Sequence, residues 1–363
     1  MTDVKHQKIA VLGAGSWGTA FAKVVADAAA SSGADRQVVL WGRNPTTMEA
    51  MQQSRTNEGY FPGIKLPDNM VMTADAAEAL TGASVVVLAI PAQVLRSQLE
   101  VFAPLIEEDA LLVSLAKGLE MGTGLRMSEV MIEVLQGHLI ASGAAPETVE
   151  VVPGRVTVLS GPNLAKEIIA EQPTTSVVAA QSEETARQIA AICAADYFRP
   201  YTNTDIVGVE IGGLVKNVIA LCVGMCEGKQ YGDNSKASVM TRGLAETTRL
   251  ALALGGKSET MSGLAGMGDL IATCASPLSR NHTAGRLLAE GIAPDQLHTV
   301  MTQTAESIKS APVVAELARK VGVEMPITEA VTAVLDRRIS VEELAPALLG
   351  RSLKSEQSTP VAS

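Results

Sequence analysis

The stretch KIAVLGAGSWGTA, Lys8–Ala20, decides the fold of this chain. A short, mostly apolar run leads directly into a Gly-x-Gly-x-x-Gly turn, and an alanine-rich stretch of helical composition follows to about Ala30. In this order Gly13 allows a tight turn after a strand, Gly15 lets the backbone approach a pyrophosphate, and Gly18 permits close packing of helix against strand. The motif therefore predicts a dinucleotide-binding turn, with a plain strand-to-helix turn as the alternative.

A second predicted strand, Gln37–Trp41, ends at Gly42-Arg43-Asn44. In this kind of fold a carboxylate at the end of the second strand binds the ribose 2′-hydroxyl of NAD and repels the 2′-phosphate of NADP. Here the position carries Arg43 and no acid, and a guanidinium can pair with a phosphate. We therefore expect NADPH to be preferred over NADH. A solvated loop arginine is the alternative interpretation.

Further apolar runs continue a pattern of strands that alternate with helical segments. They cover residues 71–72, 84–90, 111–116, 156–160, 175–180 and 198–202. Continuous apolar runs are typical of a parallel sheet that is covered on both faces. The pattern predicts an α/β fold, a Rossmann-type doubly wound sheet followed by an all-helical C-terminal domain.

The composition of the chain changes near residue 205, where stretches rich in Ala, Leu and Met with helical spacing replace the strands. We expect a dinucleotide-binding domain over residues 1–205, an all-α substrate-binding and catalytic domain over 206–350, and a flexible tail over 351–363. Residues 31–36 and 137–155 contain polar residues, Gly and Pro between elements, and are expected to be surface insertions.

Composition argues against several classes of protein. The chain of 363 residues has a formal charge of −10 and no basic cluster, which argues against a nucleic-acid partner. We expect no membrane span, because no uninterrupted apolar run approaches ~18–20 residues. The four cysteines and four histidines form no compact cluster, so neither a disulfide framework nor a metal site is expected. The first motif follows the N-terminus too closely for a signal peptide, which predicts a cytoplasmic protein.

Two lysines stand in apolar surroundings. Lys117 follows a predicted strand and precedes a glycine, and the carboxyl ends of the strands line the ligand crevice of such a sheet. Lys216 lies within the apolar stretch Glu210–Leu221, where burial without a partner would be costly or would shift its pKa. We interpret both as functional residues. The alternatives are a surface charge for Lys117 and snorkelling to solvent for Lys216.

Three predicted turns that open helices add further polar groups. Ser160–Ala165 follows a strand, Gly263–Gly268 leads to Asp269 at the start of an apolar helix, and Ser279–Asn281 begins another helix. Ser, Arg and Asn in succession beside backbone N–H groups suit a phosphate anion. The alternatives are a helix cap for Asp269 and an arginine in a capping loop for Arg280.

Six ordered motifs together resemble bacterial NAD(P)-dependent glycerol-3-phosphate dehydrogenase. They are GAGSWGTA at 13–20, SLAKGLE at 114–120, LSGPNLAKE at 159–167, GGLVKNVIAL at 212–221, GLAGMGDLIATC at 263–274 and SRN at 279–281. The resemblance implies an oxidoreductase that reversibly reduces dihydroxyacetone phosphate to sn-glycerol 3-phosphate with NADPH or NADH, for glycerophospholipid synthesis. It also implies a small phosphorylated substrate and a homodimer.

The resemblance further implies a role for each matching residue. Lys216 matches the catalytic acid/base, Lys117 a lysine that touches both substrate and cofactor, and Asp269 the carboxylate beside them. The implied substrate-binding positions are Lys117, Gly161, Asn163, Lys216, Asp269, Thr273, Ser279, Arg280 and Asn281. The implied cofactor-binding positions are Gly13, Gly15, Ser16, Trp17, Gly18, Arg43, Lys117, Ala165, Arg280, Thr304 and Glu306.

Two positions depart from the family pattern. Thr304-Ala305-Glu306-Ser307 stands where a Glu-Gly pair is usual, and Asn163 stands where Ser or Thr is common. Two other classes match part of the pattern: a 3-hydroxyacyl-CoA or 6-phosphogluconate type of dehydrogenase, and a non-catalytic NADP(H)-binding sensor. The former needs a catalytic histidine in mid-chain or a different lysine context. The latter does not need Lys216, Asp269 and Arg280 together.

Overall fold

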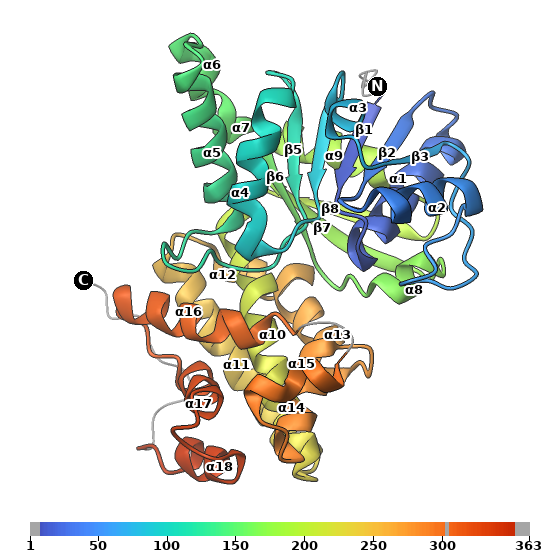
Figure 1. Ribbon diagram of the computed structural model, residues 1–363. Coiled ribbons are helices and arrows are strands. Elements are labelled where there is room, and N and C mark those ends of the chain that lie inside the picture. Colours follow the sequence, from blue (N-terminus) through green and yellow to red (C-terminus); the bar gives the residue numbers. More distant parts are fainter. Residues whose placement is uncertain (1–7, 302–304, 353–363) are drawn as a thin grey trace.

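The computed structural model describes residues 8–301 and 305–352, which form two parts that pack against each other (Figure 1). The first part is a sheet between layers of helices, and the second is helical. The last strand ends at Asn203 and the first helix of the second part begins at Ile206. Thr304 and residues 353–363, most of the predicted tail, lie outside the described residues.

Eight strands form one sheet in the order β3-β2-β1-β4-β5-β6-β7-β8. The strands are β1 (Lys8–Leu12), β2 (Gln37–Trp41), β3 (Met70–Thr73), β4 (Val85–Leu88), β5 (Leu111–Ser114), β6 (Val156–Ser160), β7 (Thr174–Ala180) and β8 (Phe198–Asn203). Neighbouring strands are parallel except β6 and β7. This order confirms the predicted Rossmann-type doubly wound sheet.

The order of the strands reverses at β1. Leu12 at its carboxyl end is paired with Trp41 of β2 on one side and with Leu88 of β4 on the other. Ligands of open α/β sheets bind in the crevice at such a reversal. The glycine turn, which begins directly after Leu12, therefore opens into that crevice.

Helices cover both faces of the sheet because the strands are apolar on both. One core joins the sheet to α1 (Ser16–Ser32), α2 (Pro45–Ser54), α8 (Ala165–Ile169) and α9 (Glu183–Cys193). The other core joins it to α3 (Ala76–Leu80), α4 (Ala92–Phe102), η1 (Ala103–Leu105), α5 (Met127–Ala141), α6 (Pro146–Glu150) and α7 (Val152–Arg155). Residues 31–35, at the end of α1, are exposed as expected of a surface connection.

The prediction that residues 137–155 form a surface insertion holds in part, because residues 140–151 are mostly exposed, but the segment is largely helical and its end is buried. Helix α5 continues to Ala141, and the short helices α6 and α7 follow it along the chain. Val152 is fully buried and Arg155 nearly so, because α7 packs against α5. Both short helices have proline in the first turn, a position where proline fits a helix. The Pro residues of this segment therefore lie within short helices.

The second part is built around α10 (Ile206–Gly228), which other helices surround. These are α11 (Asp233–Ala253), α12 (Ser258–Met261), η2 (Leu264–Gly268), α13 (Asp269–Ala275), α14 (Arg280–Ala289), η3 (Pro294–Gln296), α15 (Leu297–Val300), α16 (Ser307–Lys320), α17 (Pro326–Leu335) and α18 (Val341–Leu349). A Cβ atom at Gly224 would lie 2.0 Å from the carbonyl oxygen of His282 in α14. Glycine there permits the close crossing of α10 and α14.

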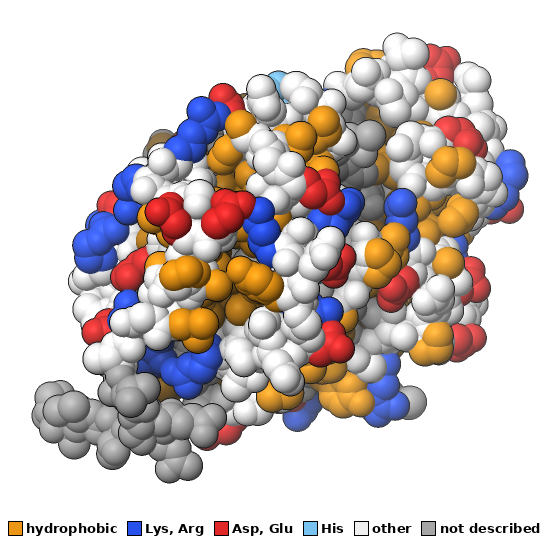
Figure 2. Space-filling model, turned by 90° about the horizontal axis from the view of Figure 1, so that it is seen from below, with side chains coloured by type: hydrophobic (Ala, Val, Ile, Leu, Met, Phe, Trp, Pro, Cys, Tyr) orange, Lys and Arg blue, Asp and Glu red, His pale blue; other side chains and the backbone are white. Residues whose placement is uncertain are grey.

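Helix α10 bears on the expectation of no membrane span: Glu210 and Lys216 interrupt its apolar run, yet a spanning helix requires only enough length and an apolar overall composition. By length and composition alone it meets that requirement, yet 83% of its most apolar window is buried inside the protein. Its apolar composition is thus accounted for by the helices packed around it. Seen from the helical end, the surface shows apolar side chains in small groups among charged ones (Figure 2).

Candidate active site

The glycine turn after β1 has the geometry of a dinucleotide site. Gly13 has a φ of +123°, and a Cβ atom there would lie 2.4 Å from the carbonyl oxygen of Ala89. A Cβ atom at Gly18 would lie 1.9 Å from the carbonyl oxygen of Gly13, whereas one at Gly15 would meet no atom within 4 Å. The first and third glycines are thus required by packing, and the second faces open space. Helix α1 begins at Ser16 with no side-chain cap, so its N-terminus can receive a pyrophosphate.

Neighbouring residues support this turn. The side-chain amide of Asn57 donates hydrogen bonds to the carbonyl oxygen of Ala14 at 3.2 Å and to Thr19 Oγ1 at 2.9 Å. Trp17 Nε1 is buried and has no hydrogen-bond partner within the protein. Because buried polar groups are normally hydrogen-bonded, this N–H is a candidate for contact with a ligand. Arg43 is exposed directly after β2, and Asn44 caps α2 by accepting a hydrogen bond from the Thr47 N–H. These residues fit a dinucleotide.

Two lysines and one aspartate meet where the sheet contacts the helical part. Lys117, which follows β5, donates to Asp269 Oδ2 at 2.8 Å and to the carbonyl oxygen of Gly161 at 2.9 Å. Lys216 of α10 donates to Asp269 Oδ1 and, at 2.8 Å, to Thr273 Oγ1. Asp269 is only 1% exposed and binds both ammonium groups. The snorkelling alternative for Lys216 and the capping alternative for Asp269 are therefore wrong.

This cluster has unusual electrostatics. Burial lowers the pKa of Lys216 to about 7; the negative charge of Asp269 opposes this shift and the positive charge of Lys117 adds to it. Burial also raises the pKa of Glu306, while the positive charges of Arg280, Lys117 and Lys216 oppose that shift. A lysine with a pKa near neutrality can both donate and accept a proton at working pH.

The turn after β6 lies against the same cluster. A Cβ atom at Gly213 of α10 would lie 2.5 Å from Ser160 Oγ and 3.6 Å from Lys117 Cδ, so this glycine lets the strand end and the helix approach each other. Gly161 has a φ of +120°, which glycine adopts readily. The Ser160 hydroxyl and both amide atoms of Asn163 are buried without protein partners. Three unpaired polar atoms beside an ammonium group indicate a site for a polar ligand.

Ala165 is the first residue of α8 and follows this turn directly. Of this turn, the sequence predicted Gly161 and Asn163 as substrate-binding residues. Ser160 was missed, although a serine at the carboxyl end of an apolar strand in this fold is a signal that points to the crevice.

The predicted anion site lies at the start of α14. Ser279 caps this helix by accepting a hydrogen bond from the His282 N–H at 3.3 Å, and Asn281 Oδ1 accepts one from the Ser307 N–H at 3.1 Å. Arg280 is exposed, and its charge reaches Glu306. Ser279 is thus the cap of this helix, and the alternative of an arginine in a capping loop remains for Arg280, the exposed first residue of α14.

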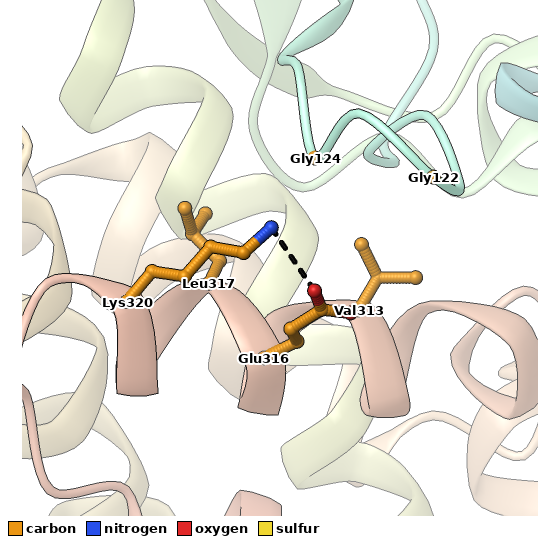
Figure 3. A pocket seen from close by; sticks show the side chains of 6 residues that line it. All are labelled: Gly122, Gly124, Val313, Glu316, Leu317 and Lys320. Atoms are coloured by element: carbon orange, nitrogen blue, oxygen red, sulfur yellow. Dashed lines mark ion pairs between the residues drawn. The ribbon is translucent and has the colours of Figure 1, made fainter.

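Other features of the surface do not join the site. A shallow hollow lies between the loop at Gly122 and Gly124 and helix α16, beside the 3.0 Å ion pair of Lys320 and Glu316 (Figure 3). Within residues 8–301 and 305–352, no group of three His, Cys, Asp or Glu residues is placed to hold a metal ion. All four cysteines are buried free thiols.

A dinucleotide turn on a Rossmann-type sheet, with a buried lysine and carboxylate from a helical second part, defines the class of nicotinamide-dependent dehydrogenases. Family models described as the N-terminus and the C-terminus of NAD-dependent glycerol-3-phosphate dehydrogenase match residues 8–186 and 205–346. The chain belongs to this family of glycerol-3-phosphate dehydrogenases. Because the chain belongs to this family, it is not assigned to either of the two alternative classes considered from the sequence.

Similar proteins extend over nearly the whole chain. Glycerol-3-phosphate dehydrogenase (NAD(P)+) of Thermobifida fusca is 51% identical over 350 residues, 96% of this chain and 98% of the relative. The enzyme of the same name from Corynebacterium glutamicum is 49% identical over 349 residues, 96% of this chain and 99% of the relative. The crystal structure of glycerol-3-phosphate dehydrogenase from Coxiella burnetii is 33% identical, with a TM-score of 0.84 over 96% of this chain and all of that one.

Proposed function

We propose that the protein reduces dihydroxyacetone phosphate reversibly to sn-glycerol 3-phosphate with NADPH or NADH. The observation that carries the proposal is the buried Lys216, which is hydrogen-bonded to the same aspartate, Asp269, as Lys117. The product supplies glycerophospholipid synthesis.

The chemistry follows from the placement of these charges. When bound, the nicotinamide supplies a hydride to the carbonyl carbon of the substrate. Lys216 Nζ donates a proton to the carbonyl oxygen, and Lys117 stabilises the negative charge that develops there. Asp269 holds both ammonium groups in place through its two oxygens. In the reverse direction, neutral Lys216 accepts the proton of the secondary hydroxyl.

We assign the polar atoms without protein partners to ligand binding. Ser160 and Asn163 then contact the substrate together with Gly161, Lys117 and Thr273, and the start of α14, with Ser279, Arg280 and Asn281, binds its phosphate. The cofactor lies along Gly13, Gly15, Ser16, Trp17, Gly18 and Ala165, with Arg280 and Glu306 near its nicotinamide end. Thr304 remains a prediction outside the described residues.

The preference for NADPH rests on Arg43. Its exposed position directly after β2 is where a 2′-phosphate of the adenosine ribose would lie. We also propose that residues 1–205 form the dinucleotide-binding domain and residues 206–350 the substrate-binding and catalytic domain, with each domain also contributing residues to the ligand of the other. A homodimer in the cytoplasm without a membrane span completes the proposal; exposed apolar side chains such as Ile271 and Leu349 of the helical part provide contact surface.

A spectrophotometric assay with dihydroxyacetone phosphate tests the function, run in parallel with NADPH and with NADH. We expect turnover with both and a higher kcat/KM with NADPH. The control is Arg43→Ala, which should lower kcat/KM for NADPH and leave that for NADH nearly unchanged. Absence of turnover with both cofactors would overturn the function, and a preference for NADH would overturn the role of Arg43. The molar mass of the protein, measured by light scattering after size-exclusion chromatography, tests the proposed dimer. A monomeric mass would contradict it.

A further inference from the structure

The loop that carries Lys117 is closed at its base. It runs from the end of β5 to the start of α5, and Leu119 and Arg126 form an antiparallel bridge across it. The Glu120 N–H donates to the carbonyl oxygen of Leu125 at 2.9 Å. Movement of Arg126 therefore displaces the strand segment that follows Lys117.

A buried carboxylate of the helical part binds the base of the Lys117 loop. Glu210 of α10 accepts hydrogen bonds from Arg126 Nη1 at 2.7 Å, from the Ser128 N–H at 2.9 Å and from Ser128 Oγ at 2.6 Å. It is 9% exposed and lies on the same helix as Lys216. Arg126 also pairs with Glu129 at 2.7 Å, so its guanidinium is held from two sides.

We infer that Glu210 is a positioning residue, which fixes the Lys117 loop against the helix of Lys216 and so keeps both ammonium groups on Asp269. This inference rests on the proposed function. A buried ion pair is weak evidence for a gain in stability, since the cost of desolvation can exceed the attraction. Glu210 has a geometric consequence instead, because its hydrogen bonds with Arg126 and Ser128 hold the base of the Lys117 loop against α10.

The electrostatic consequence can be worked out from the groups around Lys216. These are Asp269, Lys117, Glu306 and Cys274; around Glu210 they are Arg126 and Glu129. If Lys117 moves away, Lys216 loses a positive neighbour and has Asp269 to itself. Both changes favour its charged form, so its pKa rises.

A second buried glutamate provides a matched control. Glu246 of α11 is 2% exposed and accepts hydrogen bonds from the backbone N–H groups of Ile327 at 2.7 Å and Thr328 at 3.3 Å. Its partners lie at the start of α17, away from the Lys117 loop. Glu246→Gln should therefore perturb stability without moving Lys117.

The test compares Glu210→Gln, Glu246→Gln and the natural chain in two measurements. The first is the pH dependence of kcat for reduction of dihydroxyacetone phosphate, with the dissociation constant of NADPH. The second does not depend on turnover: acetylation of Lys216 by acetic anhydride against pH, followed by peptide mass spectrometry. For Glu210→Gln we expect a loss of kcat of about tenfold, an NADPH constant within about twofold, and a labelling midpoint at higher pH.

Glu246→Gln should leave unchanged both the midpoint of the pH dependence of kcat and the midpoint of Lys216 acetylation. Glu210→Gln with a lowered melting temperature but the midpoints of the natural chain would overturn the inference, because a merely structural role predicts that result. If Glu210→Gln does not fold, Ser128→Ala removes one of the three hydrogen bonds and must shift the labelling midpoint in the same direction. An inactive natural chain would defeat the proposed function, while the labelling result would still decide the inference.

Discussion

Lys216 combines two properties that seldom occur together, a charged group and an apolar helix around it. Its ammonium group is stabilised by Asp269 and Thr273, and the residue is only 7% exposed. Burial lowers its pKa to about 7, so the charged and neutral forms coexist near neutrality. One lysine can then serve as acid in reduction and as base in oxidation.

This pKa gives the first prediction. Reduction should slow as the pH rises through about 7, because only the protonated lysine donates a proton. Oxidation of sn-glycerol 3-phosphate needs the neutral amine and should speed up over the same interval. The measurement is kcat in both directions on each side of that pH, at saturating cofactor. Profiles that rise and fall together would contradict the role of Lys216.

Ser160 gives the second prediction. Its buried hydroxyl has no protein partner, and an unsatisfied group of this kind costs ~1–3 kcal/mol. Ser160→Ala should leave the free energy of unfolding unchanged or higher, while the KM for dihydroxyacetone phosphate rises by about tenfold, ~1.4 kcal/mol. Steady-state kinetics and urea unfolding measure the two effects.

Ser176→Ala is the matched control. The Ser176 hydroxyl is buried in β7 and donates to the carbonyl oxygen of Ser160 at 2.7 Å. Its loss should lower the free energy of unfolding by ~1 kcal/mol and leave KM unchanged. A Ser160→Ala variant that behaves like this control would show that its hydroxyl does not contact the substrate.

At the residue scale, the sequence predicted charges better than their partners. Lys117, Lys216 and Asp269 stood out because they interrupt apolar or glycine-rich stretches. Their contact with one another joins residues that are 152 and 53 positions apart, which no local spacing encodes. The hydrogen bond from Ser307 to Asn281 was invisible for the same reason.

At the scale of elements, Glu246 joins α11 to the start of α17 and gives the third prediction. Burial raises its pKa from 4.5 to about 7, with the backbone N–H groups of Ile327 and Thr328 opposing the shift. Between these pH values the folded protein holds a proton that the unfolded chain releases. The contribution of this group to the free energy of unfolding is therefore lost as the pH rises through about 7.

Glu246→Gln removes that titration. The free energy of unfolding of the variant should fall less with rising pH, from 4.5 to about 7, than that of the natural chain. Urea unfolding at a series of pH values measures the difference. Equal slopes in the two proteins would contradict the assignment.

Elements with a strong pattern were predicted closely. The strand β4 is apolar on both faces and was expected from its continuous run, and β8 was found where Phe198 begins a short one. Helices α6 and α7 were missed, since each has at most five residues and begins with proline-containing turns. Such short helices are stabilised by packing against α5 and not by their own sequence.

At the scale of the whole molecule, the two parts are joined by ion pairs of two partly buried cations, Lys117 and Arg126, with the buried carboxylates of Asp269 and Glu210. The fourth prediction concerns Asp269→Asn, which leaves two ammonium groups without their carboxylate. Breaking a buried ion pair costs ~3–5 kcal/mol, and this cost is reduced if Lys216 releases its proton. We therefore expect the free energy of unfolding to fall by ~3 kcal/mol. Urea unfolding without ligands measures it. A fall in the free energy of unfolding of less than ~1 kcal/mol would contradict a stabilising role of Asp269 between the two parts.

The formal charge of −10 describes the far field of the molecule and not its site. In the proposed site, the positive side chains of Arg43, Lys117, Lys216 and Arg280 serve the two phosphorylated ligands. The acidic surface therefore does not oppose binding of these anions within the crevice.

In the proposed mechanism, Lys216 moves the proton while other groups bind the cofactor. Its most direct test measures kcat for reduction of dihydroxyacetone phosphate by Lys216→Ala, together with the dissociation constant of NADPH from its fluorescence. We predict that kcat falls by about 10³-fold or more while the NADPH constant stays within about twofold. A variant that keeps turnover near that of the natural chain, with NADPH bound normally, would contradict this role of Lys216.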